Sequence, residues 1–113
     1  MTGILSVTIT AASREEAETI ARAVVEKRLA ACVNIVLGVQ SIYRWQGKVE
    51  EAREWMLLVK TTAATFAALQ KLVKEMHSYE CPCIVASPIV AGDAAYLAWV
   101  RDSVEDTVDT QSA

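Results

Sequence analysis

The chain has 113 residues, of which 53% are hydrophobic, and its formal net charge is -3 at pH 7. This length fits one domain with a single core, and the scattered basic residues lack the clustering that a nucleic-acid-binding surface requires. The longest aliphatic stretches are too short to span a bilayer, and three cysteines without framework spacing predict reduced thiols in a cytoplasm.

The first part of the chain reads as a strand followed by a helix. Over residues 3–10, apolar and small polar residues alternate, which predicts a strand with one buried face. Ser13 then stands three residues before Glu16, the spacing of a capping box in which each side chain satisfies a backbone amide of the other. The apolar stripe that follows predicts an amphipathic helix.

Two long strand patterns come next, over residues 32–45 and 49–60, with a glycine-containing turn between them. Strands of about five or six residues are typical, so this hairpin is unusually long. Both of its faces carry bulky apolar residues, with Tyr43 and Trp45 on one face and Ile42 on the other. Because an exposed apolar edge aggregates unless another chain covers it, we predict a closed homo-oligomer. The alternative is a hairpin folded over its own sheet.

The last part of the chain predicts a helix, a strand and a final helix. Thr61 or Thr62 is expected to cap the first of these helices, whose apolar residues recur at helical spacing. Residues 84–90 favour a strand, and Pro88 within it indicates a sheet edge because proline cannot donate to a ladder. Asp93 is expected to cap the final helix.

This order of elements is the split βαβ plan with one extra helix. It predicts an α+β, ferredoxin-like sandwich in which helices cover one face of an antiparallel sheet. The connection rules put the first and third strands at the centre and the second and fourth at the edges. We expect a single domain over residues 1–106 and a polar C-terminal tail over 107–113.

Four motifs occur together and in order, at 29–34 (LAACVN), 41–48 (SIYRWQGK), 57–61 (LLVKT) and 77–89 (HSYECPCIVASPI). This set resembles the CutA family, the proteins named for divalent-cation tolerance, and the resemblance extends from the first strand to Trp99. It implies a ferredoxin-like fold assembled as a compact homotrimer, with long hairpins packed between subunits. It also implies a link to copper and other divalent metals, and no catalysed reaction is established for the family.

The chain departs from the family pattern at three positions. In copper-linked bacterial relatives a cysteine ends the first strand, and here Ile9 stands there. The usual motif after the second helix is His-Pro-Tyr-Glu-x-Pro-Glu, whereas here Ser78 replaces the proline and Cys83 the final glutamate. Losing one thiol and gaining another predicts a soft metal site that differs from that of the relatives.

The candidate metal ligands are His77, Cys81 and Cys83. The two cysteines share a face if their segment is extended, and a helix-to-strand turn can bring His77 near Cys83. Imidazole and thiolates suit copper and zinc, with affinity highest for copper, so the expected cofactor is copper or another divalent metal ion. The alternative reading is a helix-ending histidine beside two small core cysteines. A catalytic Cys-His pair lacks an evident oxyanion device, so we expect no enzyme.

A second candidate site combines aromatic walls with a few charges. Such a set is typical of a small-ligand cleft and equally of a subunit interface. Lys60, at the end of an apolar strand, also needs solvent or a carboxylate partner such as Glu80. The family resemblance implies that several members of the set lie in a cleft between subunits: Tyr43, Trp45, Glu51, Lys60, Tyr79, Glu80 and Trp99.

These observations favour one of three functions. The first is a non-enzymatic homotrimer that binds divalent or transition metals and contributes to metal-ion tolerance. The second is a PII-like signalling trimer with a small-ligand cleft between subunits, but the chain lacks a glycine-rich loop or a basic cluster to hold a nucleotide. The third is an acyl-phosphate hydrolase, which needs an anion-binding loop after the first strand. We predict the first.

Overall fold

The computed structural model describes residues 2–104, so residues 105 and 106 of the expected domain and the expected tail lie outside the described residues. Within residues 2–104, no helix has the length and apolarity needed to cross a membrane. The elements in chain order are β1 (Ile4–Ala11), α1 (Arg14–Glu26), β2 (Cys32–Trp45), β3 (Lys48–Thr62), α2 (Phe66–Met76), β4 (Ile84–Pro88) and α3 (Ala94–Ser103).

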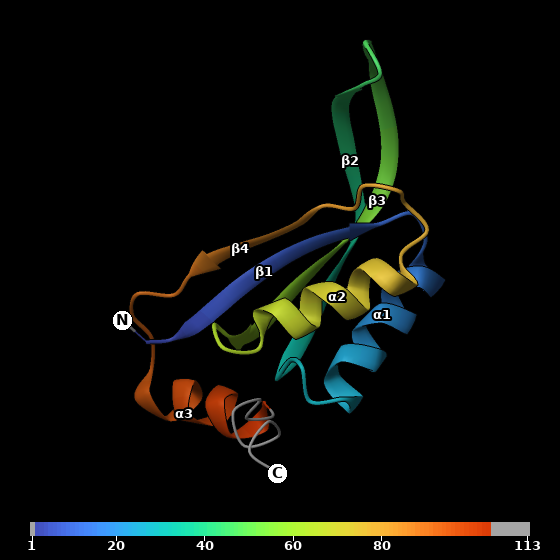
Figure 1. Cartoon of the computed structure of the whole chain (residues 1–113). Helices are drawn as coiled ribbons and strands as arrows, with labels where there is room; N and C mark the ends of the chain where they lie inside the picture. The colour runs from blue at the N-terminus through green and yellow to red at the C-terminus, as the bar shows by residue number, and fades with distance from the viewer. Residues whose placement is uncertain (1, 105–113) are drawn as a thin grey trace.

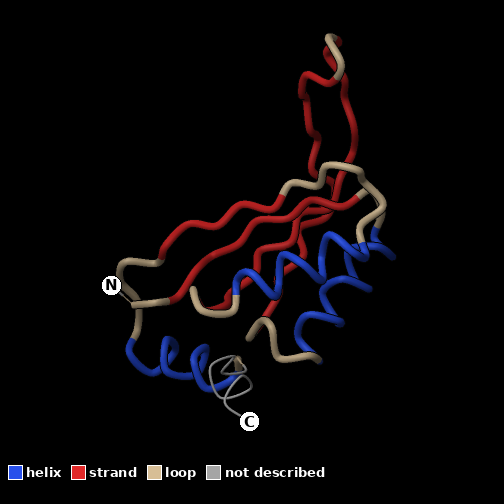
Figure 2. Tube along the Cα trace, in the orientation of Figure 1, coloured by secondary structure: helices blue, strands red, loops and turns tan. Residues whose placement is uncertain are grey.

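The strands form one four-stranded sheet in the order β2-β3-β1-β4, and every neighbouring pair is antiparallel. The helices α1 and α2 cover one face of this sheet, while α3 lies at the end that holds the N-terminus (Figure 1). Figure 2 shows the same two-layer arrangement of helices against strands. The predicted α+β split βαβ plan is therefore confirmed, including central β1 and β3 and the position of Pro88 on an edge strand.

The main core lies between the sheet and the two long helices. Alternate residues of β1 and β3 point toward α1 and α2, and burying a Leu, Ile or Val side chain fully contributes about 1.5–3 kcal/mol each. A second cluster joins Ile4 to the buried face of α3. The largest fully buried side chains of the main core are Val7, Ile9, Ile20, Val24, Leu57, Val59, Leu69 and Val73.

The capping box at the start of α1 forms only in part. The hydroxyl of Ser13 accepts a hydrogen bond from the N–H of Glu16 at 3.1 Å, as expected. The expected return bond to Ser13 is wrong, because the carboxylate of Glu16 accepts instead from the N–H of Ala12 at 3.0 Å and from the N–H of Ser78 at 2.7 Å. Glu16 therefore connects the helix start to the segment that follows α2.

The expected cap of α2 is also wrong. Thr61 and Thr62 end β3, where they pair with Leu5 and Ile4 of β1. Thr61 is fully buried and its hydroxyl donates to the carbonyl of Leu29 at 2.6 Å. The N-cap residue of α2 is Thr65, three residues later. The pairing of Thr61 and Thr62 with β1 thus outweighs the preference of threonine for a helix N-cap.

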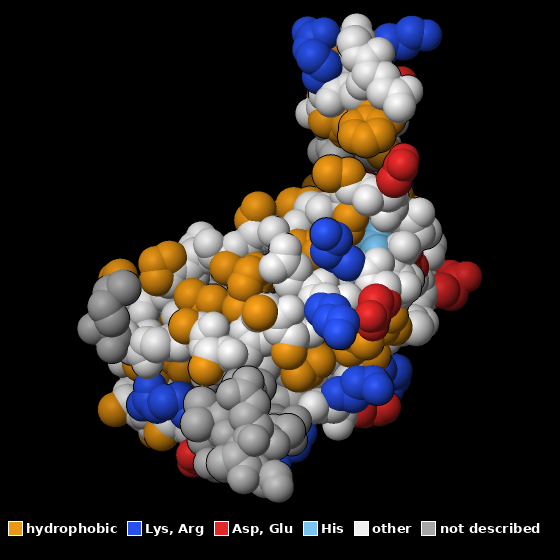
Figure 3. All heavy atoms as spheres, in the orientation of Figure 1, with side chains coloured by type: hydrophobic (Ala, Val, Ile, Leu, Met, Phe, Trp, Pro, Cys, Tyr) orange, Lys and Arg blue, Asp and Glu red, His pale blue; other side chains and the backbone are white. Residues whose placement is uncertain are grey.

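The distal half of the β2–β3 hairpin stands clear of the rest of the chain (Figure 1). A register irregularity between Val36 and Val39, where Gly38 has a φ of 71°, precedes this half. Its apolar side chains are exposed, with Ile42 at 65% and Val49 at 63%. The alternative of a hairpin folded over its own sheet is therefore wrong. Figure 3 shows hydrophobic side chains below a tip that carries basic ones.

Candidate functional site

An open groove of about 680 Å³ lies where the hairpin meets the loop between α2 and β4. Among residues 2–104, its walls hold two thiols, two carboxylates, three aromatic side chains and no Lys or Arg. Residues from three strands and the loop contribute: Thr10, Ser41, Tyr43, Trp45, Glu54, Ser78, Tyr79, Glu80, Cys81 and Cys83. The groove therefore presents acidic, aromatic and soft donor groups to a guest.

His77 fixes the start of this loop. Its side chain is 0% exposed, Nε2 lies 2.7 Å from the carbonyl of Thr10, and Nδ1 lies 3.0 Å from the backbone N of Tyr79. Because a carbonyl can only accept and a backbone N–H can only donate, this network assigns a neutral ring with its proton on Nε2. Both ring nitrogens are thus engaged in holding the loop against β1.

Glu16 holds the same loop from the side of α1. Its Oε2 accepts from the N–H of Ser78 and lies 3.8 Å from Nδ1 of His77. Partial burial acts to raise the pKa of Glu16, but hydrogen bonds from the N–H groups of Ser78 and Ala12 outweigh burial and lower this pKa overall. Glu16 is therefore an ionised carboxylate whose hydrogen bonds hold the loop against the start of α1.

On the opposite side of the loop, the hydroxyl of Tyr79 donates to Oε2 of Glu54 at 2.8 Å. Glu54 is only 6% exposed. Burial, and then this hydrogen bond to a carboxylate, raises the pKa of Tyr79 well above its ordinary range. Glu54 forms no ion pair within 4.0 Å to any residue of the described chain, so its negative charge lacks a basic partner there.

The two cysteines of the groove are free and exposed, so the reading of them as small core residues is wrong. They lie in the loop between α2 and β4, since β4 begins only at Ile84. Partial burial, and then the charge of Glu54, raises the pKa of the Cys83 thiol. Cys83 therefore holds its proton more firmly than an ordinary cysteine does.

The structure bears on the expected three-ligand metal site in two ways. Cys81 and Cys83 face the same groove, whereas His77 is not among the groove residues. Over residues 2–104, no group of three or more His, Cys, Asp or Glu side chains is gathered in a way that could hold a metal ion. One chain thus offers two thiols and nearby carboxylates, and a metal could reach His77 only if a hydrogen bond of its ring broke.

Four of the seven expected cleft residues line the groove: Tyr43, Trp45, Tyr79 and Glu80. The other three do not. Glu51 accepts a hydrogen bond from Gln40 at 3.0 Å on the exposed hairpin, and Trp99 lies on α3, with its ring centroid 5.6 Å from that of Tyr96. Lys60 is opposite Cys32 in the sheet register and makes no ion pair within 4.0 Å of any carboxylate of the described residues, so the single chain leaves it without a carboxylate partner there.

Sequence reasoning missed Glu54, the most buried acid of the groove. The hairpin strand also contains Glu50 and Glu51, both exposed, and nothing in the local sequence separates the three acids. Only the position of the α2–β4 loop over one face of the hairpin buries Glu54 and brings Tyr79 to it. The burial of Glu54 thus depends on a contact between segments that are distant in sequence, and the residue pattern of the strand does not reveal it.

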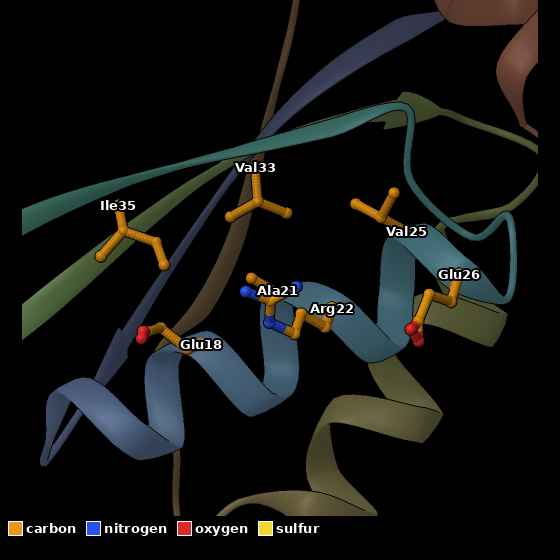
Figure 4. A pocket seen from close by; sticks show the side chains of 7 residues that line it. All are labelled: Glu18, Ala21, Arg22, Val25, Glu26, Val33 and Ile35. Carbon is orange, nitrogen blue, oxygen red and sulfur yellow. The ribbon is translucent and has the colours of Figure 1, made fainter.

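A second hollow, of about 320 Å³, lies between α1 and the edge strand β2 (Figure 4). Val33 and Ile35 of β2 point into it toward Ala21 of α1. Glu18 and Arg22 stand along its helical side. None of the described residues that line it has a thiol, imidazole or aromatic side chain, so its chemistry is less specific than that of the first groove.

The fold and the groove together define a ferredoxin-like α+β domain with soft and acidic donors beside a long hairpin. Residues 5–103 match the family model described as CutA1 divalent ion tolerance protein. The chain therefore belongs to the CutA1 family. That description refers to ion tolerance and names no reaction.

Individual relatives agree with this assignment. The divalent-cation tolerance protein CutA of Thermus thermophilus is 57% identical over 97 residues, which cover 86% of this chain and 94% of the relative. The protein of the same name in Archaeoglobus fulgidus is 50% identical over 97 residues, which cover 86% of this chain and 94% of that relative. A solved structure of the Thermus thermophilus protein superposes with a TM-score of 0.89, at 54% identity, and covers 90% of this chain and 99% of that one. The resemblance found in the sequence is thus confirmed.

Proposed function

We propose that this protein is a non-enzymatic metal-binding protein that contributes to divalent-cation tolerance, with copper as its preferred ion. The observation that carries the proposal is the pair of free thiols, Cys81 and Cys83, that face one groove beside Glu54 and Glu80. Soft thiolates select copper and zinc over harder ions, and affinity for such donors peaks at copper. Membership of a family named for divalent ion tolerance supports the same function.

In this proposal the two thiols are the principal ligands and His77 is secondary. Both ring nitrogens of His77 already hold the loop, so ligation there breaks a contact with Thr10 or Tyr79. Metal binding by the thiols breaks no such contact and requires only that each thiol release its proton. Because Cys83 has a raised pKa, metal must displace this proton, and affinity rises with pH.

We propose further that the protein works as a homotrimer, with the groove forming part of a cleft between subunits. The support is the exposed apolar surface of the projecting hairpin, including Ile42 and Val49. A large exposed apolar patch marks an interaction surface. Structural zinc sites use four ligands, so for zinc the two thiols of each chain leave positions that a neighbouring copy can complete.

A cytoplasmic location is part of the same proposal. It is supported by three free cysteines, because reduced thiols are typical of cytosolic proteins. A solved relative from Archaeoglobus fulgidus carries the name periplasmic divalent cation tolerance protein. Fractionation of the native host, with detection by antibody, tests the compartment directly: a periplasmic signal would contradict this part of the proposal.

Calorimetry with Cu(I) and Zn(II) tests the metal function. We expect copper to bind more tightly than zinc, and Cys83→Ser and Cys81→Ser each to weaken copper binding by at least about tenfold, or about 1.4 kcal/mol. His77→Ala should have a smaller effect. The matched control is Cys32→Ser, because Cys32 lies outside the groove with its sulfur 3.5 Å from the hydroxyl of Tyr96. Unchanged copper affinity in the Cys81/Cys83 double variant would mean adventitious binding only.

A further inference from the structure

Glu54 is a buried carboxylate whose charge no basic side chain of residues 2–104 pairs with. It is 6% exposed, its Oε2 accepts from the hydroxyl of Tyr79, and it makes no ion pair within 4.0 Å in the described part of the chain. No Lys or Arg of the described part of this single chain lines the groove that Glu54 faces. Burying a charge without an opposite charge is costly, so this position gains free energy from a cationic guest.

The walls around Glu54 are aromatic. Tyr43 and Trp45 are each 44% exposed in the single chain, and Tyr79 forms a third wall. The faces of such rings attract cations that lie within about 6 Å of the ring centroid, and aromatic cages of this kind bind alkylammonium groups. A hydrated metal ion gains less from these apolar walls than an organic cation with a hydrocarbon body does.

The carboxylate also keeps free hydrogen-bonding capacity. The hydroxyl of Tyr79 occupies Oε2, which leaves Oε1 and further lone pairs to accept from an ammonium N–H. Glu80 adds a second, exposed carboxylate to the groove. At about 680 Å³ the groove has room for a small alkylamine. Anionic guests such as phosphates are disfavoured because two carboxylates and no basic side chain line it.

We infer that this groove binds a small organic ammonium ion, a protonated alkylamine, with its charge at Glu54 and its hydrocarbon body against Tyr43, Trp45 and Tyr79. This guest uses oxygen and aromatic groups rather than the thiols. The inference therefore stands or fails independently of metal binding by Cys81 and Cys83.

A fluorescence titration in EDTA tests the inference in the absence of metal. The probes are n-butylammonium chloride and 1-butanol, which share a hydrocarbon chain and differ in charge. We expect a saturable change in tryptophan emission with butylammonium and none with 1-butanol. The change should disappear in Trp45→Phe, which identifies the groove as the place of binding.

Two matched variants sharpen the result. Glu54→Gln removes the charge but retains an oxygen that can accept from Tyr79, and it should weaken butylammonium binding by at least about tenfold, or about 1.4 kcal/mol. Glu51→Gln is the control, because Glu51 lies on the same strand outside the groove. Circular dichroism verifies that both variants are folded. Equal responses to the two probes, or full affinity in folded Glu54→Gln, would overturn the inference.

Discussion

The hydroxyl of Tyr79 donates a hydrogen bond to Oε2 of Glu54 across 2.8 Å and so joins the α2–β4 loop to the hairpin. The pKa of Tyr79 is raised in the folded protein, first by burial and then by this bond, so the folded state holds the phenolic proton more firmly than the unfolded state. The two protein segments that form the groove are therefore linked by a contact that requires a neutral tyrosine.

The first prediction concerns alkaline pH. The stabilisation from neutral Tyr79 is fully present below the unfolded tyrosine pKa of about 10. Above that value the unfolded state loses the proton first, so the free energy of unfolding should fall as pH rises toward the raised pKa of the folded state. Urea denaturation across this range measures the slope. Tyr79→Phe should flatten it, and an identical slope in this variant would contradict the linkage.

Acid pH should act through Glu16. Its pKa is lowered in the folded state, so its contribution is complete above the unfolded glutamate pKa of about 4.3 and is lost as pH falls through the folded value. Glu16→Gln should therefore lower the free energy of unfolding at neutral pH and change it little in strong acid. Denaturation at both pH values measures this. A constant difference between the variant and the parent would exclude ionisation as the cause. Glu15→Gln, an exposed neighbour, is the control.

His77→Ala should destabilise the fold strongly. The substitution empties a fully buried side-chain position and removes the partners of the Thr10 carbonyl and the Tyr79 N–H. Leaving buried polar groups unsatisfied, together with the cavity, should lower the free energy of unfolding by about 2–5 kcal/mol. Lys74→Ala, an exposed change on the preceding helix, should alter it by less than about 0.5 kcal/mol. Equal stability in the two variants would show that His77 does not anchor the loop.

Assembly should depend on the apolar surface of the hairpin. Ile42 is 65% exposed in the single chain, and we expect a neighbouring subunit of the proposed homotrimer to bury it. Ile42→Asp should then weaken assembly, since an unpaired charge buried at an interface costs several kcal/mol. Light scattering should report a multiple of 12.3 kDa for the parent and smaller species for the variant. The exposed change Glu50→Ala on the same hairpin is the control, and a parent of 12.3 kDa would contradict the proposal.

Much of the fold was predictable because its signals are local. Alternation in β1, the helical stripe of α1 and the glycine turn after Trp45 each identify an element from adjacent residues. The edge position of Pro88 also followed, since proline lacks the donor that a central strand needs. The cap of α2 was missed because Thr61 has a stronger tertiary role, in which its buried hydroxyl donates to Leu29.

The site was predictable in its residue types and less so in its contacts. The segment that begins at His77 contains the three predicted metal ligands, and both of its cysteines face the groove. The role of Glu54 and the engagement of both nitrogens of His77 depend on which strand the loop crosses. The family resemblance groups Lys60 and Trp99 with the groove residues, but both lie outside the groove of the single chain.

In the proposed function, the thiols of Cys81 and Cys83 bind the metal. X-ray absorption at the copper edge on the Cu(I)-loaded protein tests this most directly, because sulfur neighbours are distinguished from oxygen and nitrogen. We predict sulfur neighbours in the parent and in the Cys32→Ser control, and their loss in the Cys81→Ser/Cys83→Ser double variant. A parent spectrum with only oxygen and nitrogen neighbours, or one unchanged in the double variant, would contradict the claim.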